Sequence, residues 1–177
     1  MSEISRALEE CGALQFGDFT LASGAKSDYY IKIKKASTNP RVLYLMSQLM
    51  AEKMQKENIR PDRIAGIVLG SIPLAAALSM ATGIPYVMLR KEQKDHGTKG
   101  LIEGDLEKGD KVLVVEDVIT TAGSSVSAIK VLRENGAIVT EVMAVVDREG
   151  GGIENLKEIG VSLYSLIKGS EIVKGKK

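Results

Sequence analysis

Two adjacent carboxylates precede a run of small, hydroxyl-rich residues in the stretch KVLVVEDVITTAGSS, residues 111–125. Glu116 and Asp117 follow four apolar residues, and the chain then continues through Thr120, Thr121, Ala122, Gly123, Ser124 and Ser125. At the carboxyl end of a strand, small residues let backbone N–H groups reach a phosphate, and a helix N-terminus favours its negative charge. Carboxylates accept hydrogen bonds from vicinal ribose hydroxyls or order the hydration shell of Mg²⁺. The stretch therefore predicts a site for a sugar phosphate.

The alternative for this stretch is a strand-to-helix turn with an incidental acidic N-cap, which explains the hydroxyl residues but not the adjacent carboxylates. Neither GxxxxGK[ST] nor GxGxxG occurs in the sequence, which disfavours the common nucleotide-binding loops. The apolar strand, acidic pair and threonine-rich loop together resemble the phosphoribosyl pyrophosphate (PRPP) signature of type I phosphoribosyltransferases. The resemblance implies that the loop from Thr120 to Ser124 holds the 5′-phosphate. It also implies that Glu116 and Asp117 hold the ribose hydroxyls, with Asp117 a candidate catalytic residue.

A second stretch, RKEQKDHGTKG, concentrates positive charge at residues 90–100. Glycines supply hinges and almost nothing apolar anchors it, so we expect a mobile lid that could bring cations to a departing pyrophosphate. Most charged runs are solvated loops, and that is the alternative. The stretch resembles the flexible catalytic loop of orotate phosphoribosyltransferases, which in that family reaches across a homodimer interface. The resemblance implies roles in trans for Arg90, Lys91, Lys94 and His96, of which Lys94 and His96 are the catalytic candidates.

Two further stretches concern the base. FTLASGAKSDYYI, residues 19–31, is similar to the N-terminal hood of the same family, in which Tyr30 would contact the base. VVDREGGG, residues 145–152, places Arg148 just after a strand, where the family uses an arginine against orotate. A planar guanidinium suits a planar carboxylated ring. Ordinary packing of the tyrosine and a surface charge before a glycine turn are the respective alternatives.

The sequence departs from the pattern of many bacterial members at two positions. Ala22 and Gly70 stand where those enzymes have lysines that contact substrate. Lys26 could replace the missing charge, and backbone N–H groups of residues 70–72 at a helix start could also bind pyrophosphate. Glu116, the first acid of the pair, stands where the family has an aspartate. Glutamate keeps the negative charge, and its side chain is longer.

Short apolar runs recur with helical stretches between them, which indicates strands buried on both faces of a parallel sheet. The expected strands are 64–69, 86–89, 112–115, 139–146 and 161–167, and the expected helices are 2–14, 40–58, 72–80 and 124–134. Residues 19–34 look like short strands with a turn at 23–24. We predict one α/β domain with a central, mostly parallel sheet flanked by helices, the type I phosphoribosyltransferase fold that the resemblance implies. Its parts would be a hood element (1–35), the α/β core (36–170) and a flexible tail (171–177).

The composition limits the partners. The chain has 24 Lys and Arg residues and 23 Asp and Glu residues, so its net charge is too small to attract nucleic acid or an anionic membrane. The N-terminus carries charges where a signal peptide needs an apolar core, and no apolar run reaches the length that spans a bilayer. The single Cys11 suggests a reducing compartment. We therefore expect a cytoplasmic protein without nucleic-acid or membrane partners.

The resemblance implies a transfer of the phosphoribosyl group from PRPP to orotate in pyrimidine (UMP) biosynthesis, carried out by a homodimer. The products would be orotidine 5′-monophosphate and pyrophosphate, and the Mg²⁺ cofactor would be held mainly by PRPP without direct protein ligands. A purine phosphoribosyltransferase is the alternative enzyme, which Tyr30 and Arg148 would distinguish. A PRPP-sensing regulator is the other alternative, disfavoured by the cationic loop and by the absence of a nucleic-acid-binding motif.

Overall fold

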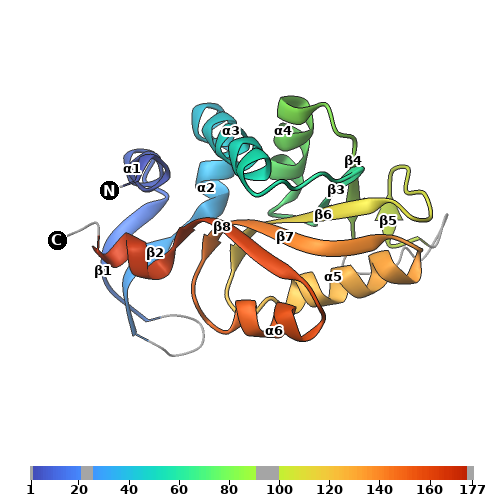
Figure 1. The fold of residues 1–177 in the computed structure, drawn as a ribbon. Helices are drawn as coiled ribbons and strands as arrows, with labels where there is room; N and C mark the ends of the chain where they lie inside the picture. The colour runs from blue at the N-terminus through green and yellow to red at the C-terminus, as the bar shows by residue number, and fades with distance from the viewer. Residues whose placement is uncertain (1, 21–25, 91–99, 175–177) are drawn as a thin grey trace.

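The computed structural model describes residues 2–20, 26–90 and 100–174. They form an α/β fold in which a central, mostly parallel sheet lies between layers of helices (Figure 1), as the sequence predicts. Within these residues the larger sheet has the strand order β5-β4-β3-β6-β7-β8, and β5 alone runs antiparallel to its neighbour. The strands are β3 (Arg63–Ile67), β4 (Tyr86–Leu89), β5 (Ile102–Glu103), β6 (Lys111–Ile119), β7 (Ile138–Asp147) and β8 (Ser162–Lys168).

The central strand β6 contributes to two hydrophobic cores, because successive side chains of a strand point to opposite faces of the sheet. Leu113 and Val115 lie in the core on one face, and Val112 and Val114 lie in the core on the other. Helices cover both faces (Figure 1): α3 (Pro40–Lys56) and α4 (Ile72–Thr82) cover the first, α5 (Gly123–Glu134) and α6 (Gly152–Glu158) the second.

The start of α3 confirms the helix predicted from Asn39 and Pro40. Asn39 is the N-cap, and its Oδ1 accepts hydrogen bonds from the N–H groups of Arg41 and Val42 at 3.1 and 3.3 Å. Pro40 occupies the first turn, where its missing N–H costs nothing. The next helix, α4, ends at its C-cap Gly83, which has a left-handed φ of +74° that glycine adopts easily.

Strand β6 is longer than predicted. It continues through Glu116 and Asp117 to Ile119, because its parallel pairing with β7 runs on to the pair Ile119 and Asp147. The acidic pair therefore lies inside the strand and not beyond its end. The segment between β4 and β6 contains a short strand that was not predicted, because β5 pairs with β4 at Met88 and Leu89.

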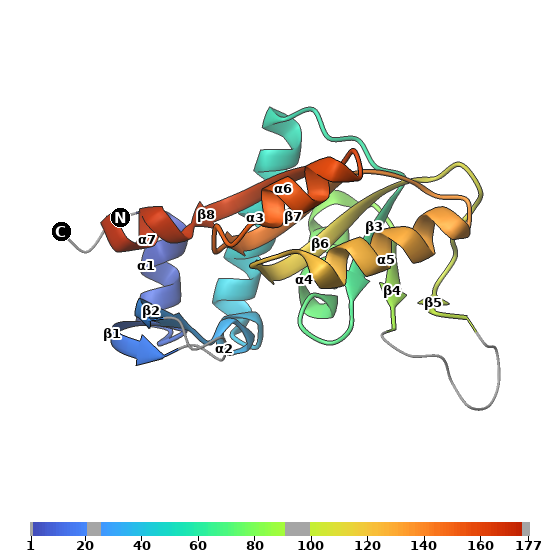
Figure 2. The same ribbon diagram turned by 90° about the horizontal axis from the view of Figure 1, so that it is seen from below.

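The N-terminal hood consists of short elements at one end of the sheet (Figure 2). They are α1 (Glu3–Glu10), the antiparallel strands β1 (Leu14–Thr20) and β2 (Lys26–Ile31), and α2 (Ile33–Ser37). The first helix is shorter than predicted, because the chain turns at Gly12, whose φ is +69°. The helix α2 was not predicted, and it crosses the expected boundary at residue 35.

The prediction of a flexible tail from residue 171 is wrong for residues 171–174, which belong to α7 (Gly169–Lys174). Ile172 is fully buried in the same core as the hood, and Glu171 Oε2 accepts a hydrogen bond from the N–H of Lys168 at 2.7 Å. The burial of one isoleucine outweighs the polar, lysine-rich composition of the stretch.

Candidate active site

Glu116 and Asp117 both lie inside β6 and both reach the turn between β3 and α4, Glu116 at Ser71 and Asp117 at Gly70. Glu116 continues the row of Val112 and Val114 toward α5, and its side chain is buried. Asp117 is half-buried.

The carboxylate of Glu116 is surrounded by serine hydroxyls. Its Oε1 accepts from Ser124 Oγ at 2.9 Å and from Ser125 Oγ at 3.1 Å, and its Oε2 lies 3.1 Å from Ser71 Oγ. Burial raises the pKa of Glu116 above its ordinary value, and the negative charge of Asp117 adds to the rise, whereas the three hydroxyls oppose it. Both oxygens of this carboxylate contact protein hydroxyls, and the predicted contact of Glu116 with ribose hydroxyls stays a prediction.

Asp117 lies against the turn between β3 and α4. Its Oδ1 accepts a hydrogen bond from the N–H of Val118 at 2.7 Å. Its Oδ2 is so close to Gly70 that a Cβ added there would collide with it. Gly70 therefore leaves room for the Asp117 carboxylate, and a lysine at this position would require Asp117 to move.

The predicted phosphate loop connects β6 to α5. Thr120, Thr121 and Gly123 are exposed there, so their donors are accessible to a ligand. Ala122, the N-cap of α5, is buried and has a left-handed φ of +63°. Ser124 opens the helix with its hydroxyl on Glu116, while its backbone N–H belongs to the first turn, where amides lack partners within a helix. The loop and helix start thus have the form expected of an anion site.

Arg148 lies on the aromatic ring of Tyr29. Its Cζ is 5.3 Å from the ring centroid, which is the geometry of a cation–π contact. Tyr29 is buried in the core of the hood, and a Cβ added at Gly169 would lie 2.5 Å from its hydroxyl oxygen. The hood strand β2 thus supports the arginine that the sequence assigns to the base.

The next residue, Glu149, joins the Arg148 loop to the start of α7. Its Oε2 accepts from the N–H of Ser170 at 2.7 Å, and its Oε1 accepts from Ser170 Oγ at 3.1 Å. Those hydrogen bonds, led by the backbone one, lower the pKa of Glu149. Asp147 Oδ1 accepts from the Glu149 N–H at 2.8 Å, and Glu149 has a φ of +56°. The loop conformation is therefore fixed on both sides of Arg148.

The phosphate loop and the Arg148 loop are in direct contact. The N–H of Arg148 donates to the carbonyl of Ile119 at 2.8 Å, and Asn155 Nδ2 donates to the carbonyl of Thr121 at 2.9 Å. A Cβ added at Gly150 would lie 2.6 Å from Thr120 Cγ2. The glycine run after Arg148 therefore permits the two loops to lie side by side at the carboxyl ends of β6 and β7.

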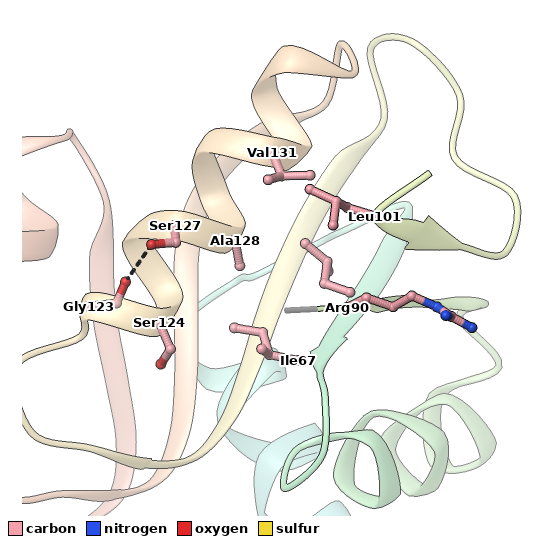
Figure 3. A pocket seen from close by; sticks show the side chains of 9 residues that line it. Ile67, Arg90, Leu101, Gly123, Ser124, Ser127, Ala128 and Val131 are labelled. Atoms are coloured by element: carbon pink, nitrogen blue, oxygen red, sulfur yellow. Dashed lines mark hydrogen bonds between the residues drawn. The ribbon is translucent and has the colours of Figure 1, made fainter. Parts of the chain in front are cut away.

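Arg90 borders a cavity of about 360 Å³ between the start of α5 and the ends of β3 and β4 (Figure 3). Its guanidinium points away from Ser124, and its Nε forms an ion pair with Glu103 Oε1 at 3.0 Å. The wall opposite Arg90 is formed by Ser124, Ser127, Ala128 and Val131 of α5. The predicted contact of Arg90 with pyrophosphate stays a prediction.

The two predicted hood residues lie on the exposed side of the hairpin. Lys26 Nζ donates to Thr20 Oγ1 at 2.9 Å, a bond within the hood. Tyr30 is 38% exposed and packs on Phe19, with ring centroids 5.5 Å apart. Strand alternation turns Tyr29 inward to Arg148 and Tyr30 outward, so the structure joins Tyr29, not Tyr30, to the predicted site.

Four residues of the sequence analysis lie outside the described part of the chain: Ala22, Lys91, Lys94 and His96. Conversely, the structure adds Ser71, Ser125, Tyr29 and Glu149 to the site. A serine before Ile-Pro signals an ordinary helix N-cap, and its hydrogen bond to a carboxylate 45 residues away has no local signal. Among the described residues, no group of three His, Cys, Asp or Glu is arranged to hold a metal, and no helix has the length and apolarity to cross a membrane.

This fold and this arrangement of loops are those of a phosphoribosyltransferase: the family model described as the phosphoribosyl transferase domain matches residues 33–165. The orotate phosphoribosyltransferase of Methanocaldococcus jannaschii is 48% identical over 97% of this chain and 96% of its own length. The crystal structure of the orotate phosphoribosyltransferase from Aeropyrum pernix matches with a TM-score of 0.87 and 34% identity, covering 98% of this chain and 97% of that one. The chain therefore belongs to the orotate phosphoribosyltransferase family.

One further solved structure carries a ligand in its name. It is the Mycobacterium tuberculosis H37Rv orotate phosphoribosyltransferase in complex with 5-phospho-α-D-ribosyl 1-diphosphate, which is PRPP. It matches with a TM-score of 0.79 and 29% identity, and 97% of each chain is covered. A protein with this fold thus accommodates PRPP.

Proposed function

We propose that this protein transfers the phosphoribosyl group of PRPP to orotate, giving orotidine 5′-monophosphate and pyrophosphate, a step of pyrimidine nucleotide synthesis. The observation that carries the proposal is the meeting of three loops at the carboxyl ends of β3, β6 and β7. Asp117 contacts the Gly70 turn, and the N–H of Arg148 is bonded to Ile119 at the end of β6. This is the edge at which parallel α/β sheets bind ligands.

The phosphate side of the site would bind PRPP at two ends. The loop from Thr120 to Ser124 and the N-terminus of α5 would hold the 5′-phosphate. The backbone of residues 70–72, at the start of α4, would hold the pyrophosphate group. Between them, Asp117 Oδ2 accepts no hydrogen bond from the described residues, so it can accept one from a ribose hydroxyl.

Mg²⁺ would assist by neutralising the charge of the leaving pyrophosphate. The free oxygen of Asp117 suits a hard cation or its hydration shell, and the described residues have no cluster of three ligands. The ion would therefore be held mainly by the diphosphate and ribose oxygens of PRPP, with Asp117 as the protein carboxylate beside it.

The reaction requires C1 of the ribose to lose pyrophosphate through a transition state with oxocarbenium character, so positioning and electrostatics do most of the catalysis. Arg148, supported by Tyr29, would orient the orotate ring through its carboxylate. Lys94 and His96 would stabilise the leaving group, together with Lys91 and Arg90. As the resemblance implies, we propose that these cations act across a homodimer, and that the protein works in the cytoplasm, which its single cysteine suits.

The test is a substrate panel. The purified protein is incubated with PRPP, Mg²⁺ and one base at a time, namely orotate, adenine, hypoxanthine or guanine, and loss of the base is followed by absorbance. We expect consumption of orotate alone, with one pyrophosphate released for each orotate. Consumption of a purine but not orotate would show a purine phosphoribosyltransferase, and PRPP binding without any transfer would show a sensor.

A further inference from the structure

The side chain of Tyr29 contacts both Arg148 and the first residue of α7. The centroid of its ring lies 5.3 Å from Arg148 Cζ, and a Cβ added at Gly169 would be 2.5 Å from its hydroxyl oxygen. Tyr29 is only 7% exposed, and side chains in a protein core are close-packed, so its ring cannot shift without displacing its neighbours. The hood, the Arg148 loop and the end of the chain therefore meet at one side chain.

Both partners of this contact with α7 are held in place by bonds of their own. The carbonyl of Tyr29 accepts from Ser27 Oγ at 2.7 Å, and β2 is paired with β1. At the start of α7, Ser170 donates its N–H and its hydroxyl to Glu149, and Ile172 is buried in the same core as Tyr29. The distance between the Tyr29 ring and Gly169 is therefore set by the fold.

Gly169 is a glycine for a reason that its own backbone does not supply. Its φ does not lie in the left-handed region that favours glycine, and alanine favours a helix more than glycine does. An added Cβ would lie 3.6 Å from Tyr29 Cζ, which is an ordinary contact, so only the hydroxyl is too close. Gly169 thus accommodates the hydroxyl of Tyr29.

The contact with Tyr29 leaves the charge of Arg148 available to a ligand. Among the described residues, no carboxylate forms an ion pair with Arg148. The face of an aromatic ring attracts a guanidinium without using its N–H donors, so these donors can still bind a carboxylate. A long side chain that is already held also loses less conformational freedom when a ligand binds.

We infer that Tyr29 is a positioning residue for the base, because it holds the Arg148 guanidinium where orotate binds, and that Gly169 makes this position of the ring possible. This inference rests on the proposed function for the identity of the base. It assigns a role in substrate affinity to α7, which lies at the end of the chain and supplies no side chain to the proposed contacts with PRPP or orotate.

The first experiment displaces the ring without replacing Tyr29 or Arg148. Gly169→Ala should raise KM for orotate about threefold to tenfold, the loss expected for a partly desolvated cation–π contact. KM for PRPP and kcat should change little, whereas a general loss of structure would affect all three. Tyr29→Phe keeps the ring and should by itself change KM for orotate little. An unchanged KM for orotate in Gly169→Ala would overturn the inference.

The second experiment is a rescue. Adding Tyr29→Phe to Gly169→Ala removes the colliding hydroxyl, so KM for orotate should return to the value of Tyr29→Phe alone. Tyr164→Phe is the matched control, because Tyr164 packs against the same core from the middle of β8, and it should not rescue Gly169→Ala. Absence of rescue by Tyr29→Phe, or equal rescue by both, would contradict the inference.

A double-mutant cycle tests whether Tyr29 acts through Arg148. In the Arg148→Ala background, Gly169→Ala should raise KM for orotate no further, because there is no guanidinium left to position. A further rise of the same size would show that the ring acts on the base directly, and the positioning role would be wrong. Tyr29→Leu, which removes the aromatic face and keeps an apolar side chain, should repeat the result of Gly169→Ala. Thermal unfolding verifies that each variant is folded.

Crystal structures without ligand separate this inference from the proposed function. Arg148 Cζ should lie farther from the ring centroid in Gly169→Ala than the 5.3 Å of the unmodified protein, and the added Tyr29→Phe should restore that distance. An unmoved guanidinium in Gly169→Ala would reject the inference, whether or not orotate is a substrate. An unmodified protein that consumes no orotate would reject the proposed function.

Discussion

The phosphate side and the base side of the site each contain a glutamate bound by serines, but burial distinguishes the two. Glu116 is enclosed between the sheet and α5, and burial raises its pKa despite three hydroxyl neighbours. Glu149 is exposed, and the backbone and side chain of Ser170 lower its pKa. On the phosphate side the loops are therefore held by buried hydrogen bonds. On the base side the Arg148 loop is held by contacts nearer the surface, with the hood and with α7.

The largest effect is expected from the cationic stretch that completes the phosphate side. Lys94→Ala should lower kcat by about 100-fold to 1000-fold, because Lys94 would stabilise charge that develops as pyrophosphate leaves. PRPP affinity should change far less, since this interaction strengthens in the transition state. Steady-state kinetics and calorimetry measure the two quantities, with the exposed Lys157→Ala as control. Equal losses in turnover and in PRPP affinity would reject this role of Lys94.

Arg148→Ala should come next and should affect the base side alone. Loss of a charge-assisted hydrogen bond to the orotate carboxylate predicts a rise in KM for orotate of about tenfold to 100-fold, with KM for PRPP little changed. Arg148→Lys separates charge from shape, because lysine keeps the charge but lacks the planar fork. If the lysine variant matched the unmodified protein, the paired geometry we assign to the guanidinium would be wrong.

A smaller effect is expected at Glu149, which acts on orotate only through the position of Arg148. Glu149→Gln weakens the acceptor for the N–H and hydroxyl of Ser170, and we expect KM for orotate to rise about twofold to fivefold. Glu154→Gln, an exposed acid in the first turn of α6, is the matched control. An equal rise of KM for orotate in the control would show that Glu149 has no specific role in positioning Arg148.

The two glutamates should also differ in the sign of their effect on stability as pH changes. A raised folded pKa means that Glu116 contributes stability below its ordinary value of 4.5, which is lost as pH rises through the folded value. A lowered folded pKa means that Glu149 contributes stability above 4.5, which is lost as pH falls through the folded value. As pH rises from about 4 to about 8, Glu116→Gln should therefore gain Tm relative to the unmodified protein, and Glu149→Gln should lose it. Parallel trends for the two variants would contradict the assigned environments.

The sequence predicted the elements that local signals define. The parallel sheet, the start of α3 at Pro40, strand β4 and the strand-to-helix connection from β6 to α5 all follow from apolar runs and capping residues. The family and the position of Arg148 after β7 were likewise readable from short motifs.

What the sequence did not predict depends on tertiary contacts. No local signal shows that Glu116 and Asp117 lie inside a strand, which follows from the pairing of β6 with β7 as far as Ile119. Ser71 meets Glu116 because β3 and β6 are neighbours in the sheet. In the same way, Ile172 orders α7 through burial in a core formed by distant segments.

The measurement that tests the two-sided site most directly is the affinity of two ligands for two variants. PRPP covers only the phosphate side, whereas orotidine 5′-monophosphate reaches from the 5′-phosphate to the base. We predict that Asp117→Asn weakens both ligands about tenfold or more, and that Arg148→Ala weakens orotidine 5′-monophosphate but not PRPP. If Arg148→Ala weakened PRPP as strongly as orotidine 5′-monophosphate, the division of the site into a phosphate side and a base side would be contradicted.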